Sequence, residues 1–398
     1  MTPNEVLPTA AGFPLRDSVS RLAPSQIVEL WEMGHGRDDV IALWVGEGDL
    51  PTPKFIMDRA HEALLAGNCF YSAKRGLPVL RHALVAYHQR HFGVALDSER
   101  VTVTASGMNA IMMALQATLS QGDNMVTLTP CWPNIFGAAA ILGVETRSVP
   151  FGKGPDGGQK LDLDALFAAC DDKTRAIFVV SPSNPTGWVI DPAEQQAILA
   201  FCRTRGIWLL ADEVYHRFVY DRAVAPSFLE IAEPDDPLLV VNSFSKTWAM
   251  TGWRMGWLIH PVQLGPLIDS LIEYNTSGTQ SFIHLACVAA LEDGEDFVQE
   301  NVARSARGGA LVYEALRQLP NVRIAPPQGA FYSFFAVEGL RDSLAFCKDL
   351  LERSQVGLAP GSAFGAGGEG HIRLCFATSE ERLAEALERL RGYLATRP

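Results

Sequence analysis

The segment 240–257, VVNSFSKTWAMTGWRMGW, places one lysine and one arginine among apolar, small and hydroxyl-bearing residues. Lysine and arginine usually lie in water at the surface. Lys246 and Arg254 could still be snorkelling cations, with buried stems and solvated charges. The alternative is chemical. A desolvated lysine loses its proton more easily and becomes an amine nucleophile, whereas arginine keeps its charge and its planar fork suits a phosphate. Ser243 and Ser245 add hydroxyl donors beside both.

Extended apolar stretches alternate with helical patterns through the middle of the chain. Near-continuous apolar strands, each followed by a helix, predict a parallel sheet covered on both faces. Helices and short strands return in the last part of the chain. We therefore expect an α/β fold with a large central domain and a smaller α+β domain built from both termini. The expected boundaries are 1–48 for the N-terminal part of the small domain, 49–288 for the large domain and 289–398 for the C-terminal small domain.

Polar and unusual residues follow five of the predicted strands. In open parallel sheets, ligands bind beyond the carboxyl ends of the strands. These residues should therefore face one crevice, an arrangement that a purely structural role does not predict. They are Ser106 and Gly107, Trp132, Asn184, Asp212 and Tyr215, and Ser243 to Lys246.

These residues suit an aldehyde that also carries a phosphate, which describes pyridoxal 5'-phosphate. Lys246 could form a Schiff base with the aldehyde, and Arg254 could bind the phosphate. The Ser106-Gly107-Met108 turn opens a helix, where free N–H groups favour an anion, although a plain helix cap is the simpler interpretation of that turn alone. Asp212 ends a buried strand and could pair with the ring nitrogen; a hydrogen-bonded helix cap is its alternative. The chain has neither GxxxxGK[ST] nor GxGxxG, so no nucleotide site is predicted.

Several ordered motifs resemble those of fold-type I pyridoxal-phosphate enzymes, specifically the class I/II aminotransferases. The resemblance covers about residues 15–395 and includes the lysine signature SFSKTWAMTGWRMGW. Further matching blocks follow the family's order: SPSNPTG (181–187), ADEVY (211–215), GAFYSF (329–334) and HIRLCFA (371–377). The resemblance implies the pyridoxal-phosphate-dependent transferase fold, in which the large domain holds a mostly parallel seven-stranded sheet between helices. It also implies ping-pong transamination between an L-amino acid and a 2-oxo acid.

The resemblance also implies roles for individual residues. Lys246 would hold the cofactor as an internal aldimine and then shuttle the substrate proton. Asp212 would pair with the pyridinium nitrogen, while Tyr215 and Asn184 would hydrogen-bond the phenolic oxygen. The phosphate cup would consist of Ser106, Gly107, Met108, Ser243, Ser245 and Arg254.

Four further positions of the motifs concern the ring, the substrate and a second subunit. Trp132 matches the aromatic residue that stacks on the pyridine ring. Arg373 would clamp the substrate α-carboxylate beside Asn184 and the backbone of Gly46. Tyr71 matches a tyrosine that reaches the partner's phosphate, which implies a homodimer with shared active sites.

The substrate is left open by the sequence. An aspartate or aromatic amino acid donor is favoured, and Lys74 or Arg75 could read an acidic side chain, with surface charge as the alternative. His284 stands where the family often has glutamine and is interpreted as a core histidine. The same scaffold also serves a β-lyase, a decarboxylase-like reaction or an amino-acid oxidase. A cofactor-sensing domain of a transcription regulator is disfavoured, because the small domain begins almost at once.

The composition of the chain bears on its partners, its cellular compartment and metal binding. The formal net charge of −12 argues weakly against nucleic acid and an anionic membrane surface as partners. We expect no membrane span and no signal peptide, because no apolar run reaches about 20 residues and the start lacks a basic and an apolar segment. Seven scattered cysteines without a CxxC pair indicate a reduced, cytoplasmic protein. The nine histidines show no close ligand spacing, so we predict no metal.

Overall fold

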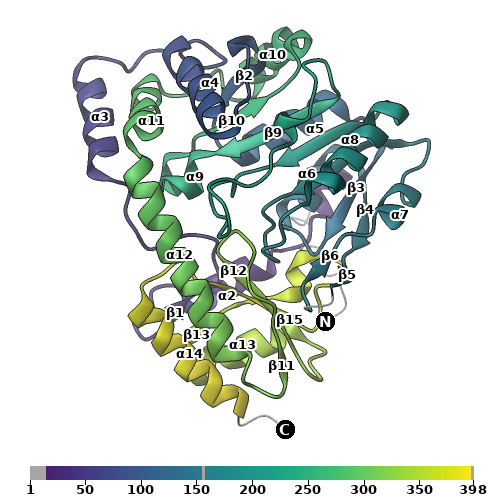
Figure 1. Ribbon diagram of the computed structural model, residues 1–398, viewed down its shortest axis with the longest axis vertical. Coiled ribbons are helices and arrows are strands. Elements are labelled where there is room, and N and C mark those ends of the chain that lie inside the picture. The colour runs from purple at the N-terminus through teal and green to yellow at the C-terminus, as the bar shows by residue number, and fades with distance from the viewer. Residues whose placement is uncertain (1–14, 155–156, 396–398) are drawn as a thin grey trace.

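The computed structural model describes residues 15–154 and 157–395 and is built around a seven-stranded sheet (Figure 1). The expectation that the chain has no signal peptide depends partly on residues 1–14, which lie outside the described residues. The strand order across the sheet is β2-β10-β9-β8-β7-β3-β4. The strands span β2 Val101–Thr104, β3 Asn124–Thr129, β4 Glu145–Pro150, β7 Thr174–Val180, β8 Trp208–Asp212, β9 Leu238–Ser243 and β10 Gly256–Ile259.

The sheet is parallel except for one strand. β10 runs antiparallel to both of its neighbours, β2 and β9, whereas the pairs from β9 across to β4 are parallel. The stretches expected to hold strands, 100–105, 124–130, 176–185, 207–215 and 238–246, each overlap one of these strands. This confirms the α/β fold with a mostly parallel seven-stranded sheet.

Side chains alternate between two apolar cores on the two faces of this sheet, as the pleat of a strand requires. In β7, Ile177 and Val179 point into one core, and Ala176, Phe178 and Val180 point into the other. The first face is covered by α3 Lys54–Leu65, α4 Pro78–Phe92, α7 Leu163–Ala168, α8 Pro192–Arg205 and α11 Ser281–Asp293. The second is covered by α5 Gly107–Thr118, α6 Asn134–Leu142 and α10 Gly265–Asn275.

A third apolar core lies in a smaller unit, below the large sheet in Figure 1. Segments from both ends of the chain build it around a four-stranded sheet of order β11-β12-β15-β14 and the parallel pair β1-β13. Its strands are β1 Ile41–Ala42, β11 Val322–Arg323, β12 Tyr332–Val337, β13 Val356–Gly357, β14 Ala359–Pro360 and β15 His371–Cys375. Its helices are α2 Gln26–Gly34, α13 Ser343–Ser354 and α14 Glu380–Ala395, with the C-terminal part of α12.

The long helix α12 (Glu295–Leu316) joins the two parts (Figure 1). Val298, near its start, packs in the core of the large sheet, whereas Val312 and Leu316 pack in the core of the smaller unit. The boundaries at residues 48 and 288 stay a prediction. Further short elements are α1 Asp17–Ser20, α9 Phe244–Thr247, the hairpin of β5 Gly152–Lys153 with β6 Gln159–Lys160, and several 3-10 turns. No helix within 15–154 or 157–395 combines the length and apolar character that a membrane crossing needs.

Candidate active site

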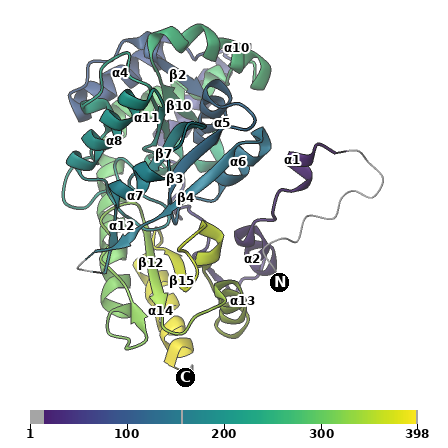
Figure 2. The same ribbon diagram turned by 90° about the vertical axis from the view of Figure 1, so that its right-hand side faces the viewer.

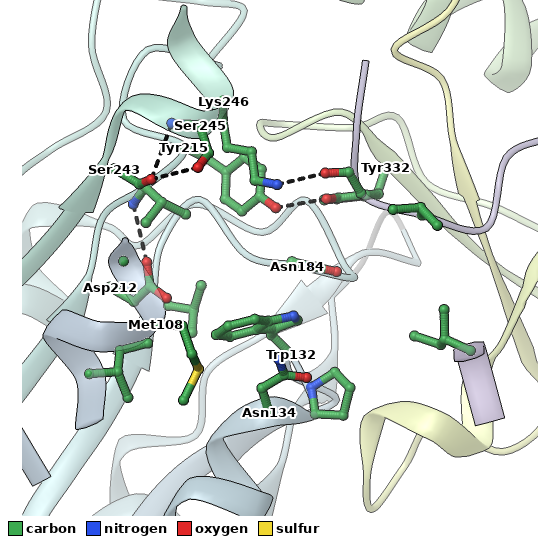
Figure 3. Close-up of a pocket in the computed structure, with 18 of the residues that line it drawn as sticks. Met108, Trp132, Asn134, Asn184, Asp212, Tyr215, Ser243, Ser245, Lys246 and Tyr332 are labelled. Atoms are coloured by element: carbon green, nitrogen blue, oxygen red, sulfur yellow. Dashed lines mark hydrogen bonds between the residues drawn. The ribbon is translucent and has the colours of Figure 1, made fainter. Parts of the chain in front are cut away.

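A cavity of about 580 Å³ lies at the carboxyl ends of the parallel strands, between the large sheet and the smaller unit. It gathers residues from Ser25 to Arg373, which are 348 positions apart in the sequence. Figure 3 shows Lys246, Asp212 and Trp132 around the same space. Of the predicted site residues, the cavity is lined by Gly46, Gly107, Met108, Trp132, Asn184, Asp212, Tyr215, Ser243, Ser245, Lys246, Arg254 and Arg373.

Lys246 lies in the single turn α9, directly after β9. Its neighbours Phe244 and Trp248 are buried in the core of the large sheet, which fixes the turn. The Nζ atom extends into the cavity and donates a hydrogen bond to the carbonyl oxygen of Gly46 at 2.6 Å. Burial lowers the pKa of Lys246 to about 8, because an apolar environment disfavours the charged amine. The amine is thus closer to its nucleophilic form than a surface lysine.

Asp212 is the last residue of β8 and is buried. Its carboxylate accepts a hydrogen bond from the backbone N–H of Val214 at 3.2 Å, but it has no salt bridge to any described residue. Burial raises its pKa to about 7, since a carboxylate with so few partners is poorly stabilised away from water. A cationic group bound in the cavity would supply the missing partner and restore the charge.

The start of α5 lies after the end of β2 and beside the cavity. Ser106 caps this helix by accepting the N–H of Asn109 at 3.1 Å. Its φ of 132° and ψ of 165° lie in a region that is almost confined to glycine. Strain of this kind persists where the surrounding structure enforces it, often at a ligand site. Gly107 and Met108 follow in the first turn and line the cavity, whereas Ser106 is not one of its lining residues.

Hydroxyl groups and a guanidinium complete this end of the cavity. Ser243 Oγ donates to Ser245 Oγ at 2.9 Å and accepts the N–H of Ser245 at 3.1 Å (Figure 3). Arg254 donates from Nη1 to the carbonyl oxygen of Thr251 at 2.6 Å. None of the carboxylates in the described ranges forms an ion pair with Arg254, so its charge is available to a bound anion.

Arg373 approaches the cavity from the smaller unit, on β15, and is buried. It donates to Asn184 Oδ1 at 2.9 Å and to the carbonyl oxygen of Trp44. Its guanidinium lies between the rings of Tyr332 and Phe364, 4.7 and 4.8 Å from their centroids. Its Nε has no hydrogen-bond partner among the residues that the structure describes. Arg373 is therefore a fixed cation with donor capacity left for a carboxylate.

Tyr332 is a residue of the site that we did not single out from the sequence. Its hydroxyl lies 2.7 Å from the hydroxyl of Tyr215, and both rings are buried (Figure 3). The sequence did contain a signal for Tyr332, because this residue lies in GAFYSF, one of the blocks that resemble the family. The sequence does not reveal which side of β12 faces the cavity. Val214, Asn134 and the α2 residues Val28 and Trp31 also line the cavity without having been predicted.

Tyr71 lies outside this cavity. Its side chain is 94% exposed beside a second groove, which is formed by residues 69–72 and 276–282. Lys74 also lies away from the cavity, with Nζ 3.0 Å from Glu273 and 3.7 Å from Asp269. Its charge is therefore neutralised within the chain.

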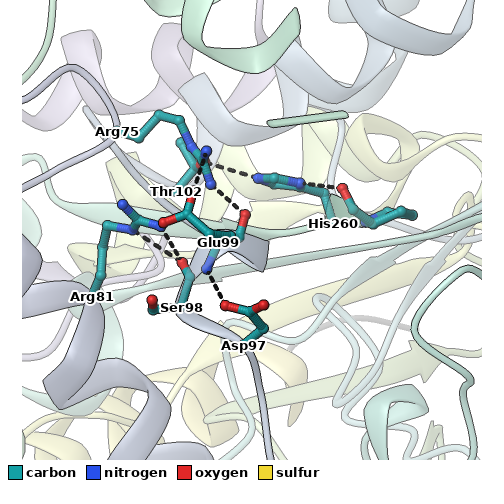
Figure 4. A network of polar contacts seen from close by, with 8 residues as sticks. Arg75, Arg81, Asp97, Ser98, Glu99, Thr102 and His260 are labelled. Carbon is teal, nitrogen blue, oxygen red and sulfur yellow. Dashed lines mark hydrogen bonds and ion pairs between the residues drawn. The ribbon is translucent and has the colours of Figure 1, made fainter. Parts of the chain in front are cut away.

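Arg75 belongs to a polar network at the start of β2 (Figure 4). Its Nε donates to Thr102 Oγ1 at 3.1 Å, and its Nη1 donates to Glu99 at 3.2 Å. Arg81 binds the same carboxylate at 2.6 Å, and His260 contacts Thr102 at 2.9 Å. Arg75 thus serves the packing of this strand end.

His284 is buried in α11, as a core histidine should be. Its Nε2 lies 2.5 Å from Thr279 Oγ1, and its Nδ1 accepts the N–H of Leu77 at 3.4 Å. Across the described ranges, no three His, Cys, Asp or Glu side chains come together as metal ligands would.

Comparison with known proteins identifies the family. The protein-family model described as "Aminotransferase class I and II" matches residues 38–390 of this chain. An aspartate aminotransferase of Pyrococcus horikoshii is 32% identical over 94% of this chain and 96% of its own. Aromatic-amino-acid aminotransferase 2 of Thermococcus litoralis is 32% identical over 96% of this chain and 98% of its own. The crystal structure of an aminotransferase from Mycobacterium tuberculosis superposes with a TM-score of 0.90, at 31% identity, and covers 97% of this chain and 100% of its own.

The protein is therefore a transferase with the α/β fold of pyridoxal-phosphate enzymes. The chain belongs to the class I and II aminotransferases, a family that depends on pyridoxal 5'-phosphate. The described residues fit this cofactor. Lys246 offers an amine of lowered pKa, Asp212 is a buried carboxylate without a salt bridge to a described residue, and Arg254 adds a cation to the cavity wall.

Proposed function

We propose that this protein moves the amino group of an L-amino acid, aspartate or an aromatic one, to a 2-oxo acid in two half-reactions. Lys246 would hold the cofactor through a covalent bond to its aldehyde carbon. The observation that carries the proposal is the convergence of Lys246, Asp212 and Arg373 on one cavity, although they come from the turn after β9, the end of β8 and the middle of β15. An amine, an acid and a carboxylate-binding cation are the groups that transamination requires of the protein.

Arg373 is the proposed clamp for the substrate α-carboxylate. Its position between Tyr332 and Phe364 holds the guanidinium plane fixed, so binding costs little side-chain entropy. Asn184 orients the same guanidinium through its Oδ1. A substrate held this way would present its Cα to the cavity, where the Nζ of Lys246 would take the Cα proton and deliver it to the cofactor's aldehyde carbon, and would carry a proton the other way in the second half-reaction. Orientation of this kind accounts for much of the rate of such a reaction.

Asp212 is proposed to keep the cofactor's ring nitrogen protonated. When bound, the cofactor supplies an electron sink for the charge left at Cα. Opposite charges a few Å apart stabilise each other strongly in a buried site. Tyr215 and Asn184 are proposed to hydrogen-bond the phenolic oxygen, and Trp132 to stack on the ring. We assign the phosphate to Ser106, Gly107, Met108, Ser243, Ser245 and Arg254.

Movement of the smaller unit is proposed to exclude water during proton transfer. Arg373 and the carbonyl of Gly46, which accepts from Lys246 Nζ, both come from outside the large sheet. Substrate bound to Arg373 would draw the smaller unit toward the large sheet. Closure of this kind strengthens electrostatic interactions in the site and suppresses side reactions.

The active form is proposed to be a homodimer with shared sites, located in the cytoplasm. The exposure of Tyr71 supports this, since it is an aromatic side chain with a polar tip beside a groove. All seven cysteines are unpaired, which suits a reducing compartment. Mixing Lys246→Ala with Tyr71→Ala subunits tests the sharing. Each variant alone should be weak or inactive, and the mixed dimer should regain one intact site. Absence of recovery in a mixture that does exchange subunits contradicts shared sites.

The reaction is tested by giving each of the twenty amino acids to the holoenzyme without an acceptor. A transaminase should release about one equivalent of 2-oxo acid per site and no ammonia, because the amino group stays on the enzyme. A β-lyase should release ammonia and pyruvate repeatedly, and an oxidase should consume oxygen. Lys246→Ala should abolish both release and the visible absorbance of the bound cofactor. Full activity of that variant would refute the assignment.

A further inference from the structure

The segment 212–217, DEVYHR, begins at the end of β8 and has polar side chains on two sides. Asp212 and Tyr215 line the active-site cavity. Glu213 and His216 do not line it, and both are buried. A buried polar side chain destabilises a protein unless it finds hydrogen-bond partners. The partners of His216 therefore show what holds this segment in place.

His216 and Tyr87 form a hydrogen-bonded pair in the interior. His216 Nε2 lies 2.7 Å from the hydroxyl of Tyr87, and its Nδ1 lies 3.0 Å from the carbonyl oxygen of Glu213. A carbonyl oxygen can only accept, so Nδ1 carries the ring proton and Nε2 accepts from the Tyr87 hydroxyl. Burial and the nearby charge of Arg217 lower the pKa of His216 well below its ordinary value. The ring is therefore neutral, and this one tautomer satisfies both contacts.

Tyr87 also contacts the turn that carries Lys246. Its ring packs edge-on against the ring of Trp248, with centroids 5.6 Å apart, and Trp248 lies two residues after Lys246. Both rings belong to the same apolar core of the large sheet. Tyr87 comes from α4, which lies near β2 and β10 and apart from the smaller unit (Figure 2). Tyr87 thus joins, from the core side, the segments that carry Tyr215 and Lys246.

The charged and titratable groups around the pair determine what a pH measurement can report. Those next to it are His88, His91, Arg90, Arg217, Glu213 and Glu295. Burial lowers the pKa of His88 to about 3 and that of His91 to about 4. Arg217 and Glu295 form an ion pair at 2.6 Å. Burial raises the pKa of Glu213 to about 7, but this residue is present in every variant compared below. Differences between those variants therefore come from displaced groups.

We propose that His216 and Tyr87 are positioning residues of the active site, and that their hydrogen bond sets Asp212 and Tyr215 relative to Lys246. This rests on the proposed function, in which Asp212 and Tyr215 hold the cofactor's ring nitrogen and phenolic oxygen. Figure 3 shows Tyr215 and Lys246 next to one another in the cavity. A small displacement of such groups slows a reaction that depends on their orientation.

The test compares Tyr87→Phe and His216→Leu, which break the pair, with His216→Gln, which keeps an acceptor for the Tyr87 hydroxyl. The visible absorbance of the bound cofactor is titrated with pH in each holoenzyme. The first two variants should shift the midpoint by at least about 0.5 pH unit, because the groups that tune the cofactor's protonation move. They should lower kcat at least about tenfold and leave KM within about twofold, since Arg373 is untouched. His216→Gln should lie nearer the wild type than His216→Leu.

A double variant tests whether the two residues act as a pair. Tyr87→Phe combined with His216→Leu should shift the midpoint no further than His216→Leu alone, because the same hydrogen bond is lost in both. Shifts that add in full contradict a shared role. Should His216→Leu fail to fold, Tyr87→Phe, which keeps the ring against Trp248, and His216→Gln still decide the outcome.

Thr102→Val is the matched control for a purely structural effect. Thr102 is also buried and its Oγ1 lies 2.9 Å from His260 Nε2, near the start of β2 and outside the cavity. The control should be destabilised in urea unfolding about as much as Tyr87→Phe, because each loses a buried hydroxyl. Its absorbance midpoint and kcat should match the wild type. If Tyr87→Phe and His216→Leu also keep the wild-type midpoint and kcat, the pair is only structural and the proposal is overturned.

The wild type separates this proposal from the proposed function. If it releases 2-oxo acid and the two variants behave like Thr102→Val, transamination stands and the positioning role fails. If it releases no 2-oxo acid from any of the twenty amino acids, the proposed function fails, and the absorbance midpoints alone decide whether the pair positions the groups around the cofactor.

Discussion

Replacing Gly256 by alanine should weaken both the fold and the binding of the cofactor. Gly256 begins the antiparallel strand β10 and lies between Thr104 of β2 and Ser243 of β9. A Cβ at this position would come within 2.7 Å of the nitrogen of Gly107 and the carbonyl carbon of Ser106, and within 2.8 Å of the oxygen of Asn242. These are backbone atoms, which cannot rotate away as a side chain can.

The magnitude follows from what has to move. Forcing an extra carbon into a packed site costs about 1–3 kcal/mol. Ser106, at φ 132°, already has a strained backbone, so the turn has little freedom to adjust. The displaced N–H groups at the start of α5 are those proposed to bind the phosphate. We therefore expect the dissociation constant of the cofactor to rise at least about tenfold, which corresponds to roughly 1.4 kcal/mol.

Gly252→Ala provides the matched control. Gly252 is four residues earlier, in the 3-10 turn Thr251–Trp253, and a Cβ there meets no atom within 4 Å. Urea unfolding of the cofactor-free proteins gives the stability difference, and titration with pyridoxal 5'-phosphate gives the dissociation constant. The control should stay within about 0.5 kcal/mol of the wild type. If the two variants behave alike, the close approach at Gly256 does not have the effect reasoned here.

Four further predictions concern polar side chains. The pKa of Asp212 is 3.8 in the unfolded chain and about 7 in the folded cofactor-free protein. Between these two pH values only the folded protein binds the proton, so the free energy of unfolding falls as the pH rises from about 4 to about 7. Asp212→Asn should therefore gain stability relative to wild type between about pH 4 and pH 7 in urea unfolding, and a constant difference would contradict this. Tyr332→Phe leaves the hydroxyl of Tyr215 unpaired and should cost about 1–3 kcal/mol, whereas removing both hydroxyls should cost less than the sum of the single variants in the same assay. Arg75→Met should lower the free energy of unfolding by roughly 1–3 kcal/mol. Lys74→Ala should leave the ratio of KM for aspartate to KM for phenylalanine unchanged. An increase of KM for aspartate alone would show that Lys74 binds an acidic side chain.

Much of the large sheet could be predicted from the sequence because its order follows local patterns. Apolar strands such as 207–211 are buried on both faces, and the polar residue at each strand end marks the edge where ligands bind. Asp212 and Lys246 were found in this way. The antiparallel direction of β10 cannot be predicted from its own residues, since the apolar pattern of GWLI fits a parallel and an antiparallel strand equally well.

Other features depend on packing between segments that are distant in the sequence. Tyr332 faces the cavity because β12 pairs with β15 in a register that sets Tyr332 opposite Cys375. In α2, the pattern QIVELWEMG predicts an amphipathic helix, but only tertiary packing decides that Leu30 is buried and Trp31 reaches the cavity. The partners of Arg75 are likewise fixed by the fold, because Glu99 lies 24 residues further along the chain.

The division into separate apolar cores has an evolutionary consequence. Lys246 is anchored by Phe244 and Trp248 in the core of the large sheet, whereas α2 is anchored by Leu30 in the core of the smaller unit. Substitutions at Val28 or Trp31 should therefore change the wall of the cavity without repacking the residues that hold Lys246. Related proteins with this architecture can therefore diverge on the exposed surface of α2 while the core around Lys246 stays the same.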